Sequence, residues 1–187
     1  MKLRLIEKII TILIVFFPIN NYANEDHSDE HRQHEAHVHG AAKLSIAIDE
    51  TTFFFELETP ALNVLGFEHK PKTDQEKERV QEVNKLFSSH ENIILIPHIN
   101  CKQTHIEIEP PYESEDVHDK DGHDEEEHGE YHLSYTLSCE DISNIKDIEI
   151  KLFDNFDGFE NIEVMWIHQE KADSSNLTKD NKIIKIK

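Results

Sequence analysis

The sequence predicts an α+β fold, in which a single domain combines an antiparallel β-sheet with one main helix. After residue 36, short stretches alternate between apolar and polar side chains, which is the pattern of half-buried strands. Residues 73–89 instead place their apolar side chains at helical spacing. The two cysteines, Cys101 and Cys139, lie near the outer ends of two such stretches. We therefore expect a sheet, a helix and a hairpin clamped by a disulfide.

The first 23 residues have the composition of a secretory signal peptide. Lys2, Arg4 and Lys8 give a basic start, residues 9–17 (IITILIVFF) are apolar, and Ala23 is a small residue at the expected cleavage site. An uncleaved anchor is the alternative, but this run is shorter than the roughly 20 residues that span a bilayer. We expect residues 1–23 to be removed on export, with no membrane insertion afterwards.

The next residues form a polar, acidic arm. Residues 24–35 contain no apolar side chain and are expected to be disordered. The full chain has a net charge of −20, and loss of the signal peptide, with a net charge of +2, leaves −22. Such a surface repels nucleic acid and anionic lipid and attracts cations. Metal ions are the simplest partners of this kind, and no nucleic-acid partner is expected.

The folded domain is expected at residues 36–187, beginning with a hairpin. From Val38 to Ile48 the even-numbered positions are mainly apolar and the odd-numbered positions more polar. Residues 49–50 are expected to turn the chain into a second strand that contains residues 53–57. In this alternation, His37 and His39 would project from the same side of the first strand.

Helical signals follow this hairpin. Pro60 ends the second strand, and residues 61–66 are expected to form a short loop or a helical turn. Thr73 and Glu76 have the spacing of a capping box at the start of the main helix, residues 73–89. A short apolar run at residues 93–96 comes before Pro97.

A second hairpin is expected to carry a flexible acidic loop, residues 112–130, at its tip. Residues 113–130 contain ten Asp or Glu, too many charges to pack in a core. The flanking strands are expected at residues 104–109 and 131–139. Because export leads to an oxidising compartment, Cys101 and Cys139 are expected to pair at the base of the hairpin. A metal-binding or redox role for the cysteines is the alternative.

The register of this second hairpin is predicted from its apolar side chains. Ile106 opposite Leu133 and Ile108 opposite Tyr131 would keep one face continuously apolar. Cys101 would then lie just outside the regular ladder, or beside a bulge. The remaining strands are expected at residues 148–153, 160–168 and 182–186, which makes about six strands in total.

Histidines occur in two clusters, and the first predicts a metal site. The chain contains 14 histidines, and neither cluster has the apolar neighbours of a core histidine. Imidazole is a preferred ligand of zinc and of other late first-row metals. His37 and His39, two residues apart on a predicted strand, could converge on one ion, with His34 or His69 completing the site. The alternative is a pair of exposed strand histidines without a ligand.

The second cluster accompanies the acidic loop. It consists of His118, His123, His128 and His132. Histidines among carboxylates are expected to bind several metal ions weakly, without a fixed geometry. A solvated, charged loop that binds no metal is the alternative.

No combination of residues predicts an enzyme. Residues 27–31 match the H-x-x-E-H pattern of inverted zinc proteases, but that chemistry needs a rigid helix and these residues lie in the polar arm. Residues 119–122 resemble part of a calcium loop but lack both essential end ligands. Nucleophile elbows, glycine-rich phosphate loops and dinucleotide fingerprints are absent from the sequence.

Three stretches of the chain resemble one known family. They are HEAHVHGAAKLSIAID, FFFELETPALNVLGFEH and LFDNFDGFENIEVMWI. They resemble the ZrgA-type periplasmic zinc-uptake proteins, and the resemblance extends over essentially the whole mature chain. It implies that His34, His37 and His39 match the histidine-rich motif, that residues 66–69 match its GFEH motif, and that residues 110–132 match its loop between the cysteines. This loop is mainly acidic here rather than histidine-rich, which suggests a lower affinity per site.

The resemblance and the residues together predict a monomeric or weakly associating zinc-binding protein of the bacterial periplasm. It would capture Zn(II) and pass it to an inner-membrane uptake system, an ABC-type importer. The alternative is a periplasmic buffer or resistance protein for zinc, copper or nickel that has no transporter partner. A structural domain with incidental histidines is a third possibility. Because imidazole must be neutral to bind metal, binding is expected to weaken below about pH 6.

Overall fold

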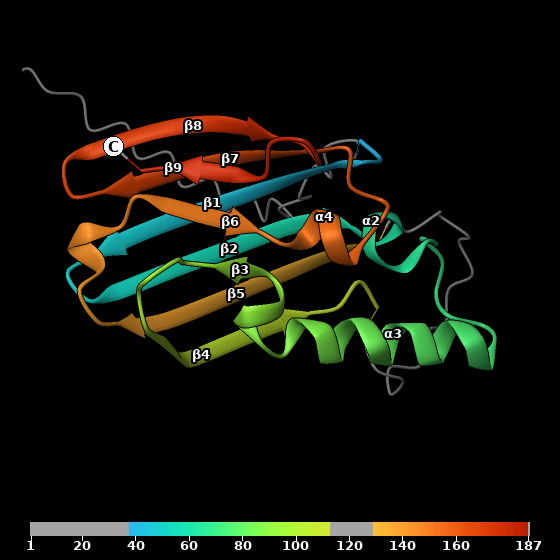
Figure 1. Ribbon diagram of the computed structural model, residues 1–187. Coiled ribbons are helices and arrows are strands. Elements are labelled where there is room, and N and C mark those ends of the chain that lie inside the picture. The colour runs from blue at the N-terminus through green and yellow to red at the C-terminus, as the bar shows by residue number, and fades with distance from the viewer. Residues whose placement is uncertain (1–37, 113–128, 187) are drawn as a thin grey trace, which may run out of the picture. The chain divides into compact units, whose positions relative to one another are not determined.

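The computed structural model describes residues 38–112 and 129–186 and arranges them in two β-sheets (Figure 1). The larger sheet has the strand order β4-β5-β2-β1-β7-β8, and the smaller one has the order β3-β6-β9. The strands are β1 (Ala41–Asp49), β2 (Thr52–Pro60), β3 (Ile94–Leu95), β4 (Cys101–Glu109), β5 (Glu130–Cys139), β6 (Asp147–Ile150), β7 (Asn161–His168), β8 (Lys171–Leu177) and β9 (Ile183–Lys185). The helices are α2 (Ala61–Leu65), α3 (Asp74–Phe87) and α4 (Leu152–Asn155), with short 3-10 turns η1 (His90–Asn92) and η2 (Ile142–Asn144). The predicted α+β class with one main helix is confirmed.

One face of the large sheet forms the core. Alternate side chains of its central strands are buried on this face, among them Leu44, Phe55, Tyr135 and Trp166. The small sheet and the helices lie over this face in Figure 1, and the Tyr135 hydroxyl donates a hydrogen bond to the carbonyl oxygen of Phe87 at the end of α3. Buried apolar surface of this kind is the main stabilising contribution to the fold.

The local predictions for the first half of the chain are largely confirmed. β1 and β2 form an antiparallel hairpin with Asp49 opposite Thr52, and residues 61–65 form the short helix α2. At α3, the Thr73 side chain accepts from the Glu76 N–H, and the Glu76 side chain accepts from the Thr73 N–H. Both halves of the predicted capping box are therefore present.

The start of the first strand was predicted wrongly. β1 begins at Ala41, whereas Val38 is 68% exposed and residues 39–40 form a turn. The alternation of buried and exposed side chains begins only after Gly40, where φ is +82°. That left-handed conformation cannot continue a strand. His39 is therefore a turn residue and not a strand residue.

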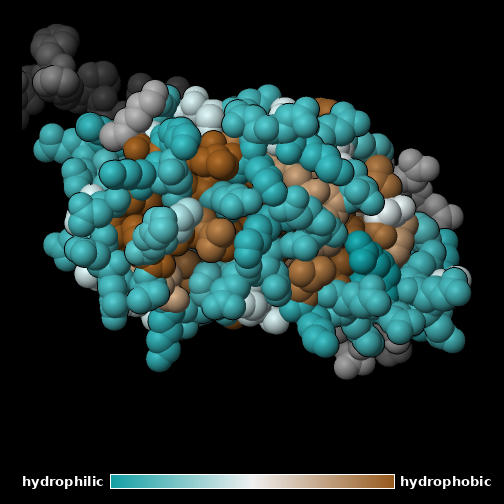
Figure 2. Space-filling model, in the orientation of Figure 1, coloured by the Kyte–Doolittle hydropathy of each residue, from teal (hydrophilic) through white to brown (hydrophobic). Residues whose placement is uncertain are grey.

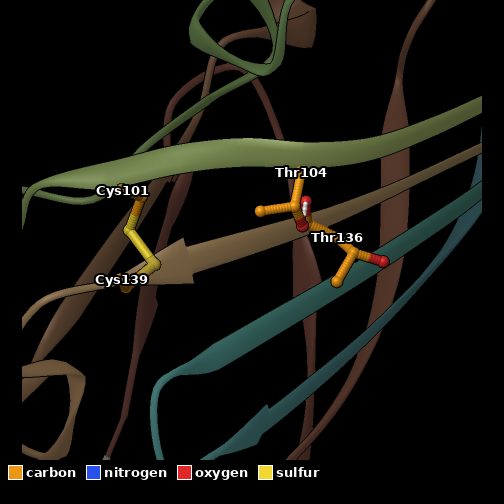
Figure 3. Close-up of a disulfide and its surroundings, with 4 residues drawn as sticks. All are labelled: Cys101, Thr104, Thr136 and Cys139. Atoms are coloured by element: carbon orange, nitrogen blue, oxygen red, sulfur yellow. Dashed lines mark hydrogen bonds between the residues drawn. A yellow bond between two sulfur atoms is a disulfide. The ribbon is translucent and has the colours of Figure 1, made fainter.

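The hairpin of β4 and β5 is held by a Cys101–Cys139 disulfide at its base, as predicted (Figure 3). The predicted register is wrong, because Cys101 pairs directly with Cys139 and Ile106 lies opposite Tyr135. The ladder shifts between Gln103 and His105, where the extra residue, Thr104, donates a hydrogen bond from its hydroxyl to the Thr136 carbonyl at 2.9 Å.

This bulge explains the error in register. It inserts one residue into β4, so the cysteines stay paired at the base while Ile108 comes opposite Leu133. The apolar side chains still share one face. Keeping the apolar side chains on one face allows two registers that differ by two residues. The bulge produces the register that was not predicted.

Three further features differ from the prediction. The strand expected at residues 148–153 ends at Ile150, and the neighbouring residues Leu152 and Phe153 are both buried in the short helix α4. β8 was not predicted, because its residues are mostly polar and exposed. β1 also pairs in parallel with β7, so the large sheet has one parallel pairing among antiparallel ones.

The visible surface is mainly hydrophilic. In the orientation of Figure 2, polar residues cover most of the domain and hydrophobic ones appear as separate patches. Leu95 of β3 and Ile183 of β9 are among the exposed large apolar residues. None of the described helices has both the length and the apolar composition needed to cross a membrane.

Candidate metal-binding site

The described candidate ligands gather at one end of the large sheet, on the right in Figure 1. The strand pairings bring the start of β1, the end of β2, the end of β4 and the start of β5 to this end. The N–H of Ala61 at the start of α2 also donates to the carbonyl of Gly129 at 2.8 Å. Val38, Tyr112 and Gly129, the described residues that border residues 1–37 and 113–128, therefore lie at the same end. The disulfide lies at the opposite end.

Gly40 fixes the turn that carries His39. Its N–H donates to Oδ1 of Asn63 at 2.8 Å, and its carbonyl accepts from the N–H groups of Glu160 and Asn161 at 2.7 and 3.1 Å. A Cβ atom at this position would lie 2.8 Å from Cγ of Glu160. The positive φ favours glycine here, and the hydrogen bonds on both sides of Gly40 hold the backbone next to His39.

His39 makes a close polar contact with Glu68. Nε2 of His39 lies 3.0 Å from Oε1 of Glu68, and the two side chains are 55% and 17% exposed. Glu68 belongs to the segment between α2 and α3, so the contact joins the turn before β1 to the stretch that contains His69. A carboxylate in this position can orient the imidazole or share a metal ion with it.

His69 has a different carboxylate partner, Glu76, in the first turn of α3. Nε2 of His69 lies 3.1 Å from Oε1 of Glu76, while Oε2 accepts from the N–H groups of Lys72 and Thr73 at 2.7 and 2.9 Å. The hydrogen bonds from Thr73 and then Lys72 lower the pKa of Glu76 to about 2. The carboxylate is therefore charged at neutral pH. The Phe67 ring lies 5.2 Å from the His69 ring and packs beside it.

His132 belongs to β5 and has other glutamates as neighbours. Its Nε2 is 3.5 Å from Oε2 of Glu130. The strand register places Glu109 of β4 on one side of His132 and Glu58 of β2 on the other. The sequence grouped His132 with the loop histidines. It also placed His132 in the strand expected at residues 131–139, and the structure confirms that strand and adds carboxylates on the neighbouring strands.

The other predicted ligands lie outside the described residues: His34, His37, His118, His123 and His128. Within residues 38–112 and 129–186, no three or more His, Cys, Asp or Glu side chains are arranged to hold a metal ion. The described part of the chain instead contributes histidine–carboxylate pairs. The role of each histidine as a zinc ligand stays a prediction.

Three residues support this region through contacts that the sequence did not predict. Asn63 is buried and links Gly40 to α2, while Glu68 and Glu76 contact the two histidines. A lone asparagine among the apolar residues of a short helix was the available signal for Asn63. Glu76 was recognised only as a helix cap, because its second partner is set by the path of the preceding loop.

Comparison with known families identifies the chain. The model of the ZrgA family zinc uptake proteins matches residues 36–186. The chain belongs to the ZrgA family. The match includes the whole described domain and so confirms the resemblance seen in the sequence. A comparison with curated proteins finds no match. As a member of a zinc uptake family, this ZrgA protein is associated with zinc, and its histidine–carboxylate pairs are the chemistry that zinc prefers.

Proposed function

We propose that this ZrgA protein binds Zn(II) in the periplasm and delivers it to an ABC-type importer, acting as a monomeric binding protein without catalytic activity. Membership of a zinc uptake family is the observation that carries this proposal. The signal-peptide composition of residues 1–23 supports export. The histidines and glutamates at one end of the sheet support metal binding at that end.

In this proposal the main site is built around His39 and His69. Both are about half exposed, and each already lies beside a carboxylate. Zinc usually takes four ligands, so His37 or His34 of the preceding segment would complete the site. The acidic residues and histidines of residues 113–130 would raise the local concentration of cations and bind them weakly.

Calorimetric titration of the mature protein with Zn(II) at pH 7.4 tests the site. The wild type should show one tight event above a weaker background. His39→Ala and His69→Ala should each weaken the tight event, whereas His105→Ala, which removes an exposed histidine of β4, should leave it unchanged. Equal titrations for all three variants would exclude this pair as the site.

A growth experiment tests delivery. Cells that lack the gene should grow poorly when a chelator limits zinc, and the wild-type gene should restore growth. The double variant His39→Ala/His69→Ala should fail to restore it at equal protein level in the periplasmic fraction. Normal growth of the deletion strain in chelated medium, combined with sensitivity to excess zinc, would instead favour a metal buffer without a transporter partner.

A further inference from the structure

We propose that Glu76 is the positioning residue of the His69 ligand: its carboxylate holds the Nε2–H of the ring and so leaves Nδ1 as the nitrogen that binds zinc. This inference rests on the proposed function, because it requires that His69 bind zinc. It adds a partner for the ligand and selects which of its two nitrogens carries the metal.

The hydrogen bonds of Glu76 define its role. Oε2 is shared by the N–H groups of Lys72 and Thr73, and the Glu76 N–H donates to Oγ1 of Thr73 at 3.2 Å. These bonds fix the carboxylate at the start of α3, a helix of 14 residues. Oε1 is then held 3.1 Å from Nε2 of His69.

The chemistry of this contact determines the tautomer of the ring. An ionised carboxylate has no proton to donate, so Nε2 of His69 must be the donor. A neutral imidazole carries a proton on only one nitrogen. Nδ1 of His69 therefore keeps its lone pair, which is the form that binds a metal ion.

The surroundings of His69 are consistent with this assignment. The Phe67 ring, which packs against the core, restricts the imidazole from one side at a centroid distance of 5.2 Å. The His69 side chain is still 47% exposed. Its hydrogen bond to Glu76 uses Nε2. The ring is thus oriented while one nitrogen stays available.

A carboxylate behind a metal-binding imidazole raises the basicity of the ligand and fixes its direction. Loss of such a partner typically weakens metal binding by about 10–100-fold. The competing arrangement places zinc between Nε2 of His69 and Oε1 of Glu76, so that both side chains are ligands. The two arrangements differ in which nitrogen of His69 keeps its proton.

Nitrogen-15 NMR of the histidine side chains distinguishes them. Long-range proton–nitrogen spectra of the mature protein at pH 7.4 should show His69 protonated at Nε2 before metal is added. Addition of one equivalent of cadmium-113 should then produce a cadmium–nitrogen coupling at Nδ1, with Nε2 still protonated. A coupling at Nε2 would overturn the inference.

The variant Glu76→Gln provides the affinity test. The single amide oxygen can still cap the helix, which turns the NH₂ group toward His69 and favours the opposite tautomer. We expect zinc affinity to fall by about 10–100-fold and the His69 signals to change to the Nδ1–H form. An unchanged affinity and tautomer would overturn the inference.

Two control variants separate this effect from charge and from helix stability. Asp74→Asn removes a neighbouring charge from the first turn of α3, and Thr73→Ala removes the other half of the capping box. Asp74→Asn should leave zinc affinity within about twofold of the wild type. Thr73→Ala keeps the backbone N–H that donates to Oε2 of Glu76 but loses the Oγ1 acceptor, so it should lower stability and reduce zinc affinity by less than Glu76→Gln does. An affinity loss in either control equal to that of Glu76→Gln would overturn the inference.

Failure of the proposed function gives a different result. In that case the wild-type protein would bind no zinc, and His69 would still be protonated at Nε2. If the wild type binds zinc tightly and Glu76→Gln binds it equally well, the proposed function stands and the role of Glu76 is wrong.

Discussion

Replacing Asn63 with alanine should destabilise the domain and release the turn that carries His39. Asn63 is only 3% exposed. Its side chain accepts from the Gly40 N–H at 2.8 Å and donates to the carbonyl of Ala41 at 2.8 Å and to Oγ1 of Thr59 at 3.1 Å. The one side chain therefore connects α2 with the start of β1 and the end of β2.

The size of the effect follows from these hydrogen bonds. A hydrogen bond contributes about 1 kcal/mol net, and a buried group left without a partner costs about 1–3 kcal/mol. Gly40 is buried, so its N–H would lack a partner in the variant. We expect Asn63→Ala to lower the free energy of unfolding by about 3 kcal/mol. Asn63→Asp should lose at least as much at neutral pH, because it keeps the acceptor but buries a charge and loses both donors.

Urea denaturation followed by the fluorescence of Trp166, which is buried in the core, measures this difference. Asn176→Ala on exposed β8 is the matched control and should stay within about 0.5 kcal/mol of the wild type. Zinc affinity should also fall in Asn63→Ala, because the His39 turn is no longer fixed. A loss below about 1 kcal/mol would refute the conclusion that this side chain holds the turn.

Three other predictions concern stability. Replacing both Cys101 and Cys139 by alanine opens a loop with a sequence separation of 38 residues and should lower the free energy of unfolding in urea by about 4 kcal/mol. The zinc affinity of the folded variant should not change. A parallel loss of zinc affinity would contradict the placement of the site at the other end of the sheet. In thermal melts, Gly40→Ala should lower stability by more than Gly66→Ala does. Both glycines have positive φ, but of the two only Gly40 has a neighbouring side chain within 2.8 Å of the added Cβ. Equal losses of stability in the two variants would show that this close contact has no cost. The pKa of Glu76 is lowered from 4.5 to about 2, so its contribution to stability is complete above pH 4.5 and is lost as the pH falls toward 2. The free energy of unfolding, measured between these pH values, should depend less on pH in Glu76→Gln than in the wild type. An identical pH dependence in the two proteins would argue against the capping contacts.

The elements that depend on neighbours in the sequence were predictable. The capping box of α3 needs only Thr73 and Glu76, and the β1–β2 hairpin needs only alternation and a short turn. The start of β1 was not predictable in this way. Gly40 adopts its turn conformation because Asn63 and Glu160, distant in sequence, bond to it on both sides.

For the hairpin of β4 and β5, the sequence predicted which strands pair but not the register of the pairing. The faces of β4 and β5 allow two registers, and only the bulge at Thr104 together with the Cys101–Cys139 pair selects the observed one. The polar residues of β8 contain no strand signal, because their conformation is imposed by pairing with β7. Such pairings depend on backbone hydrogen bonds, to which side-chain patterns contribute little.

The sequence by itself determined the composition of the candidate site, because the excess of histidine and carboxylate and the resemblance to a zinc uptake family do not depend on the fold. The tertiary structure decided which of these groups meet. His39 and Glu68 come together through the β1–β2 hairpin and α2, while His69 is directed at Glu76 by the loop before α3. Contacts of this kind require the side chains to be placed to within about an ångström. That placement comes from the packing of the whole domain and not from the spacing of residues along the chain.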